Sequence, residues 1–310
     1  MSNIEAAKRK YSSIALLIIG FLVIIRIINY FVSLISLNVF KTVLSFELHW
    51  LLVYLPGYLL LIFAFSKIKK REVEKHKLEL TEFIKFLIIS FPIVYAGNII
   101  GNVFSEIISS FSSNNPLLDL VVELQLSRII IIVLIGPFFE ELIYRKLILD
   151  RIVSYGEKPA IIFSALIFAL VHINLYQFFY AFGLGLLLAY IYIRTGKLRY
   201  SLLIHVAINI NGGVIAPMLL NLNEYPSDVA SILDLKIILP ILITTFYSYL
   251  TLAVTIIGII LIVKTSKELL FKNTEFEIER KDYKTLFGNW KVISMVILTS
   301  LLTLVNLFIY

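Results

Sequence analysis

The sequence contains no cysteine, only four histidines, and charged side chains at just 16% of its 310 positions. Without cysteine the chain has no disulfide, no thiolate zinc site and no cysteine nucleophile. It also lacks the G-x-S-x-G pattern of serine hydrolases and the H-E-x-x-H pattern of zinc proteases. So little charge in so hydrophobic a chain excludes a disordered chain and a nucleic-acid-binding protein.

Hydrophobic residues make up 59% of the chain, against about 45–50% in soluble domains. They occur in blocks long enough for the roughly 20-residue helices that cross a bilayer. We therefore predict an all-α polytopic transmembrane helix bundle of about eight or nine spans. The nine candidate spans are 12–35, 48–66, 83–106, 128–149, 159–175, 176–194, 200–220, 237–263 and 291–309.

The Lys and Arg residues are concentrated in every second connection between the predicted spans. This alternation is expected of a multi-pass protein, because cytoplasmic loops are rich in Lys and Arg. If the N-terminus is cytoplasmic, basic residues of 67–77, 145–158, 194–199 and 264–291 share its side. The net charge of +7 is then a topology signal, and no acidic partner is needed. The opposite loops carry mainly acids, namely Asp119, Glu123, Glu224, Asp228 and Asp234.

We divide the chain into N-terminal transmembrane helices (1–120), a central core (121–222) and C-terminal helices (223–310). The loop 264–291 in the last part has mixed charge, which predicts a solvated or membrane-surface helix. Gly183 and Gly185 predict close helix packing. Arg26 is expected to snorkel to the membrane surface or to pair with an acid.

Ionisable residues inside a membrane helix are costly, so each indicates a function. In span 128–149, Glu141 and Arg145 are four residues apart and are expected to pair on one helix face. Glu140 is rotated by about 100° from Glu141 and lacks this partner, which suits it to proton transfer. The alternative is a structural ion cluster that ties helices together.

Two histidines lie in later spans. His172 is predicted to share a helix face with Phe168, four residues earlier. His205 and Asn209 are also four apart, so both are expected to face one groove. There they can donate hydrogen bonds to an oxyanion or simply hold two helices together. A Glu with a His can activate water, either directly or on a metal.

These three motifs together resemble the CPBP family of intramembrane endopeptidases, which includes CAAX prenyl proteases and bacteriocin-processing proteins and is also called the Abi family. The family pattern is Glu-Glu-x-x-x-Arg, Phe-x-x-x-His and His-x-x-x-Asn, each on its own transmembrane helix. Here these are Glu140 to Arg145, Phe168 to His172, and His205 to Asn209. Pro137 and Tyr144 also match, and the resemblance covers roughly 125–215.

The resemblance implies a role for each motif residue. Glu140 with His172 would position and deprotonate the attacking water, while His205 and Asn209 would hold the oxyanion. Glu141 and Arg145 would support the site. The resemblance leaves a divalent metal such as zinc open, with Glu140, His172 and His205 as candidate ligands. We favour metal-independent chemistry, because these residues lie on separate spans.

The resemblance implies an endopeptidase with a buried catalytic cavity that acts on membrane-associated or lipid-modified peptides. The Ile-, Lys- and Asn-rich composition favours a bacterial cell membrane as its location. At ~1.5 Å per residue, His205 lies ~8 Å into its span and His172 ~20 Å into its own. A common site therefore needs either a span 159–175 that starts in the cytoplasm or a tilted, water-filled cavity. Prenylated peptides, bacteriocin leaders and signalling peptides all fit as substrates.

Two other functions stay open: a non-catalytic bacteriocin-immunity or scaffold protein, and a proton-coupled transporter.

Overall fold

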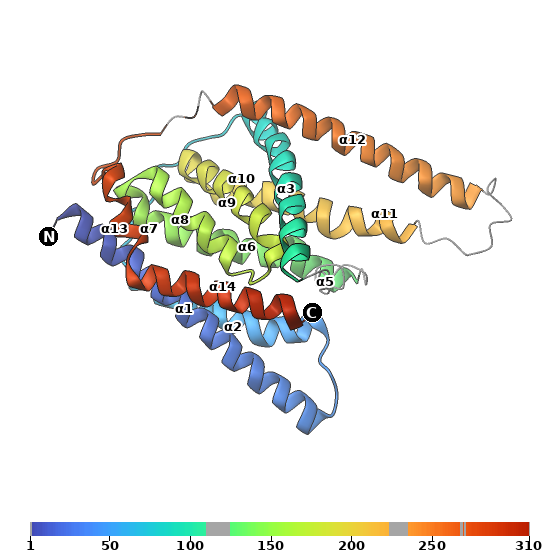
Figure 1. Cartoon of the computed structure of the whole chain (residues 1–310), viewed down its shortest axis with the longest axis horizontal. Coiled ribbons are helices and arrows are strands. Elements are labelled where there is room, and N and C mark those ends of the chain that lie inside the picture. Colours follow the sequence, from blue (N-terminus) through green and yellow to red (C-terminus); the bar gives the residue numbers. More distant parts are fainter. Residues whose placement is uncertain (1, 110–124, 223–234, 267–268, 270, 310) are drawn as a thin grey trace.

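The computed structural model describes residues 2–109, 125–222, 235–266, 269 and 271–309 (Figure 1). These residues form helices and connections, without a strand, which confirms the predicted all-α bundle. The long helices are α1 (Asn3–Ile35, continued by η1, Ser36–Phe40), α2 (Phe46–Ser66), α3 (Leu80–Ile108), α9 (Leu175–Thr195), α10 (Leu198–Ile210, continued by η5, Asn211–Ile215, and α11, Ala216–Leu222), α12 (Leu235–Ser266) and α14 (Trp290–Ile309).

Shorter elements lie between them. The stretch from 126 to 155 is one helical run of changing pitch, described by α5 (Leu126–Ile130), η2 (Ile131–Ile135), α6 (Gly136–Glu140), η3 (Glu141–Leu149), α7 (Asp150–Ile152) and η4 (Val153–Tyr155). It is followed by α8 (Glu157–Leu170). The loop before α14 contains η7 (Arg280–Asp282) and α13 (Tyr283–Phe287).

Seven helices of the described part are long and apolar enough to cross a membrane, and they correspond to seven of the nine predicted spans. The other two predicted spans, 128–149 and 159–175, are helical but differ from ordinary spans. The first carries both glutamates of the first motif, and the second is a helix of only 14 residues, α8. The count of nine is therefore not confirmed, whereas the multi-pass architecture is.

The α8–α9 hairpin forms the centre of the bundle, with α1, α2 and α14 on one side and α3 and α12 on the other (Figure 1). Two hydrophobic clusters meet at α9. One cluster joins α9 to α1, α2, α8 and α14, and the second joins it to α3 and α10. The hairpin predicted from spans 159–175 and 176–194 is thus confirmed, and it lies at the centre of the bundle.

Glycines allow the helices around α9 to approach closely. A Cβ added at Gly97 or Gly101 would collide with the α9 backbone at Tyr180 or Tyr176. A Cβ on Gly183 would lie 2.7 Å from Ile93, and one on Gly185 would lie 3.1 Å from Ala165. The close packing predicted at Gly183 and Gly185 is confirmed, and Gly97 and Gly101 form a G-x-x-x-G contact of the same kind.

We expect Gly101→Ala to lower the free energy of unfolding by about 1–3 kcal/mol, because the added methyl group overpacks the α3–α9 contact. Thermal unfolding in detergent would measure this. Gly20→Ala is the matched control, because open space surrounds Gly20 on α1. If Gly101→Ala were as stable as Gly20→Ala, the close contact between α3 and α9 would be wrong.

Helix α12 is attached to one side of the bundle. It packs on α3, where a Cβ on Gly258 would lie 2.7 Å from the carbonyl oxygen of Ile88 and 2.7 Å from Pro92. Most of its apolar side chains are exposed, including Tyr249 at 68%. This exposure suits a helix whose outer face meets lipid.

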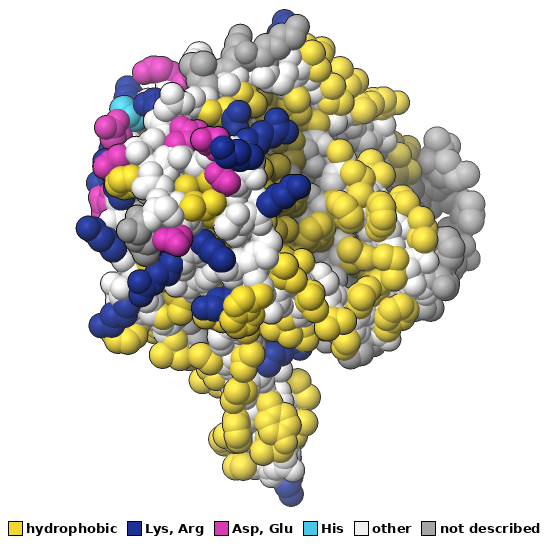
Figure 2. All heavy atoms as spheres, turned by 60° about the vertical axis from the view of Figure 1, so that its left-hand side comes forward, with side chains coloured by type: hydrophobic (Ala, Val, Ile, Leu, Met, Phe, Trp, Pro, Cys, Tyr) yellow, Lys and Arg dark blue, Asp and Glu magenta, His cyan; other side chains and the backbone are white. Residues whose placement is uncertain are grey.

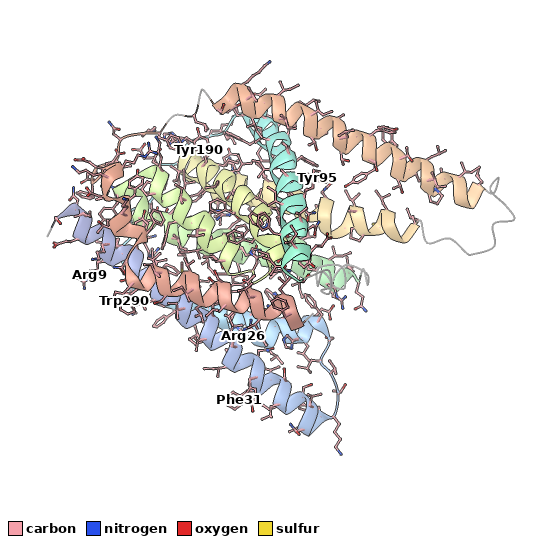
Figure 3. All side chains as sticks on the ribbon, in the orientation of Figure 1. Arg9, Arg26, Phe31, Tyr95, Tyr190 and Trp290 are labelled. Carbon is pink, nitrogen blue, oxygen red and sulfur yellow. The ribbon has the colours of Figure 1, made fainter. Side chains whose placement is uncertain are left out.

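Charged side chains gather at one end of the molecule, and hydrophobic side chains cover most of the remaining visible surface (Figure 2). The acids predicted for the opposite loops, Asp119, Glu123, Glu224, Asp228 and Asp234, lie outside the described residues. Arg26 lies on the exposed surface of α1 beside an apolar groove shared with α14 (Figure 3). In the described part of the chain it forms no ion pair, and the acids of the opposite loops lie outside that part, so both predicted alternatives stay open.

The loop 264–291, predicted as a solvated or membrane-surface helix, contains the short helices η7 and α13, and most of its described side chains are exposed, but some of its residues pack on the bundle. Phe276 and Ile278 donate backbone hydrogen bonds of 3.0 Å to the carbonyls of Ser154 and Tyr155. The side chains of Ile278 and Leu286 are buried in the main hydrophobic cluster. These apolar residues attach the segment to the end of the 126–155 run. The mixed charge of the loop does not predict this packing.

Candidate active site

The helical run that carries the two glutamates contains π-helical turns, and Pro137 is the local reason for the first one. The N–H of Gly136 donates to the carbonyl of Ile131 rather than to that of Ile132. The next residue, Pro137, has no N–H. The carbonyl of Ile132 is consequently left without a donor inside its own helix.

Asn209 of α10 satisfies that carbonyl. Its Nδ2 donates to the oxygen of Ile132 at 2.9 Å. A buried carbonyl without a partner would cost about 1–3 kcal/mol, so this contact fixes α10 against the π-helical turn. One of the two amide hydrogens of Asn209 is committed to this structural bond, and the second is left for another acceptor.

The predicted pair of Glu141 and Arg145 is present and fully enclosed. Arg145 Nε lies 3.3 Å from Glu141 Oε2, and neither side chain has any exposed surface. Arg145 also donates to the Oγ of Ser164 at 3.3 Å and stacks on the ring of Phe168 at 4.6 Å. Ser164 in turn donates to the Tyr144 carbonyl at 2.7 Å, which joins α8 to the glutamate run.

His205 bridges the two glutamates. Its Nδ1 lies 3.1 Å from Glu141 Oε1, and its Nε2 lies 3.5 Å from Glu140 Oε2. A carboxylate can only accept, so Nδ1–H donates to Glu141. Glu140 is 23% exposed, whereas Glu141 is completely buried. The sealed carboxylate therefore orients the imidazole, and the open one is accessible to a substrate or to water.

His172 occupies a different position from the one predicted. Helix α8 ends at Leu170, so His172 lies in the turn that leads to α9 and not on a transmembrane helix. Ile173, with φ +50°, has left the helical conformation. His172 Nδ1 donates to the Phe168 carbonyl at 2.6 Å, which satisfies one of the last carbonyls of α8.

The two histidines nevertheless meet at the same place. The edge-on ring of Phe168 lies 5.0 Å from the His172 ring and 5.6 Å from the His205 ring. Glu140 and His205 are both within electrostatic range of His172. The site thus combines Glu140, Glu141, Arg145, His172 and His205, while Asn209 binds one turn farther along α10.

Several residues of the site carry no sequence signal. Glu140 interacts electrostatically with Tyr58 of α2, Tyr144 of η3 and Tyr180 of α9. Tyr144 belongs to the first motif, but nothing in the sequence connects Tyr58 or Tyr180 with it. Ser164 and Ser201, which contact Arg145 and Glu141, were missed in the same way because their partners lie on other helices.

The candidate metal ligands are Glu140, His172 and His205, and within the described ranges no three His, Asp or Glu side chains converge as ligands of one ion. Nδ1 of His172 is bonded to a carbonyl and Nδ1 of His205 to Glu141, so Nε2 of each ring is the nitrogen that a metal would bind. The side chains themselves supply the groups used in the chemistry below.

Comparison with known proteins gives a match that covers the motif-bearing part of the chain. Residues 122–211 match a family model described as type II CAAX prenyl endopeptidase Rce1-like. The match spans all three motifs and supports a CAAX-type intramembrane protease at the level of the family. No curated protein and no solved structure matches the chain. The motif-bearing part of this multi-pass membrane protein is therefore Rce1-like, in agreement with the family that its three motifs resemble.

Proposed function

We propose that the protein is an intramembrane endopeptidase that hydrolyses a peptide bond with water activated by Glu140. One observation carries the proposal: His205 is held at Nδ1 by the sealed Glu141 and faces the open Glu140 through Nε2. A carboxylate and an oriented imidazole on the accessible side of a buried ion pair are the groups that general acid–base hydrolysis requires.

In the first step, the oxygen of water adds to the peptide carbonyl carbon and its proton passes to Glu140. His205 donates from Nε2 to the oxyanion that develops, because Glu141 fixes its ring and balances its charge. The second step breaks the C–N bond, and the proton held by Glu140 passes to the leaving amine. His172 assists Glu140 in orienting the water through Nε2, because its Nδ1 is bonded to the Phe168 carbonyl.

Asn209 contributes in two ways under this mechanism. Its bond to the Ile132 carbonyl fixes the depth of α10, and thereby of His205, relative to Glu140. The remaining amide hydrogen is available to the oxyanion. The Glu141–Arg145 pair keeps a charged acceptor behind His205 without exposing it to water.

The substrate is a membrane-associated or lipid-modified peptide. The description of the matching family makes peptides with a prenylated C-terminus the first class to assay. Substrates can be found by comparing peptides in membranes that contain either the wild-type protein or Glu140→Gln. A peptide released only by the wild-type protein supports the proposal.

Two outcomes of that comparison contradict the proposal. If Glu140→Gln releases the same peptides as the wild-type protein, Glu140 is not the base. If neither protein releases a peptide, and a cellular phenotype survives Glu140→Gln at equal abundance, the protein acts by binding. Solute flux into proteoliposomes tests the remaining alternative, a proton-coupled transporter.

A further inference from the structure

The turn that carries His172 has an unfavourable backbone conformation. Ile173 has a φ of +50°, in the left-handed region that β-branched residues avoid. Such a residue persists only where its surroundings hold it in place. The side chain of Ile173 supplies part of this hold, because it is 7% exposed and packs in the main hydrophobic cluster.

A second restraint comes from the C-terminal helix. Asn306 of α14 donates through Nδ2 to the carbonyl oxygen of Ile173 at 3.1 Å. Other polar side chains of α14 bond locally: Thr299 and Thr303 donate to carbonyls of their own helix. Among the described side chains of α14, Asn306 alone makes a hydrogen bond to another element.

We propose that Asn306 is a positioning residue for His172. By holding the Ile173 carbonyl, it keeps the turn in its left-handed conformation and directs the neighbouring imidazole toward Glu140. Helix α14 lies outside the matched residues 122–211, so this function extends the site beyond the Rce1-like segment. The effect on the turn is independent of the proposed function, whereas the effect on cleavage rests on it.

Hydrogen exchange of backbone amides tests the proposal without an activity assay. Asn306→Leu removes the donor but keeps a side chain of similar size, and we expect exchange of the amides of 171–177 to rise about fivefold. Thr303→Val is the matched control, because Thr303 lies one turn earlier and bonds within α14. It should leave exchange in this segment unchanged.

A cleavage assay adds the readout that separates positioning from general support. Asn306→Leu is expected to lower kcat about fivefold with little change in KM, and Asn306→Gln, which retains an amide donor, to recover part of the loss. Unchanged exchange at 171–177 in Asn306→Leu would overturn the proposal. A uniform rise in exchange across the bundle would also overturn it, since Asn306 would then be a purely structural residue. If the turn loosens but the wild-type protein cleaves no peptide, only the proposed function fails.

Discussion

Replacing Glu140 by Gln is expected to lower kcat for peptide cleavage by about 10²–10⁴-fold, the usual contribution of a general base. The amide has nearly the same shape as the carboxylate but does not accept the proton of the attacking water. Because Glu140 is partly exposed, in contrast to Glu141, the protein should fold normally. Purified protein in detergent, a prenylated peptide and product detection by mass spectrometry would measure the change.

Glu106→Gln is the matched control, since Glu106 is an exposed glutamate of α3. We expect it to cleave like the wild-type protein. The two histidines of the site, His172 and His205, can be tested as alanine variants in the same assay. If Glu140→Gln, His172→Ala and His205→Ala all retained full cleavage of a verified substrate, the mechanism proposed above would be wrong.

Arg145→Met is expected to lower the free energy of unfolding by about 3–5 kcal/mol. The substitution leaves Glu141 as a fully buried carboxylate without its cation, which is much more costly than removing a buried pair as a whole. It also removes the contacts of the guanidinium with Ser164 and Phe168. Unfolding in detergent and the amount of protein in the membrane would measure the effect.

The double variant Glu141→Leu, Arg145→Met separates stability from catalysis. We expect it to recover much of the stability lost in Arg145→Met, because no unpaired charge is left in the site. Cleavage should stay low, since His205 has lost the acceptor at its Nδ1. An Arg145→Met protein as stable as the wild type would show that the pair is not enclosed as described.

The parts of the site that sequence predicts are those set by local helix geometry. Glu141 and Arg145 are four residues apart on one helical run, so their pairing needs no knowledge of the rest of the fold. The sequence predicts the α8–α9 hairpin in a similar way, because only the short stretch around Asn174, Leu175 and Tyr176 separates two apolar blocks. Asn174 indeed accepts a hydrogen bond from the N–H of Tyr176 at the start of α9.

The rest of the site depends on how separate helices are placed. Whether Nε2 of His205 faces Glu140 depends on the depth and rotation of α10, which the Asn209–Ile132 bond fixes. That bond exists because a π-helical turn and Pro137 together free one carbonyl, a combination that periodicity does not reveal. Helix α8 ends at Leu170, before His172, and Ile173 in the following turn is buried in the main hydrophobic cluster. This tertiary contact could not be predicted from the apolar sequence around it.

The one-sided attachment of α12 makes this helix a convenient place for a spectroscopic label. Since the chain has no native thiol, a cysteine introduced as Tyr249→Cys would react alone with a maleimide dye. The dye would lie on the exposed face of α12, on a helix that packs on α3 rather than on the glutamate run. Its fluorescence in vesicles would then report the surroundings of α12 as a peptide arrives, without a change to any residue of the site.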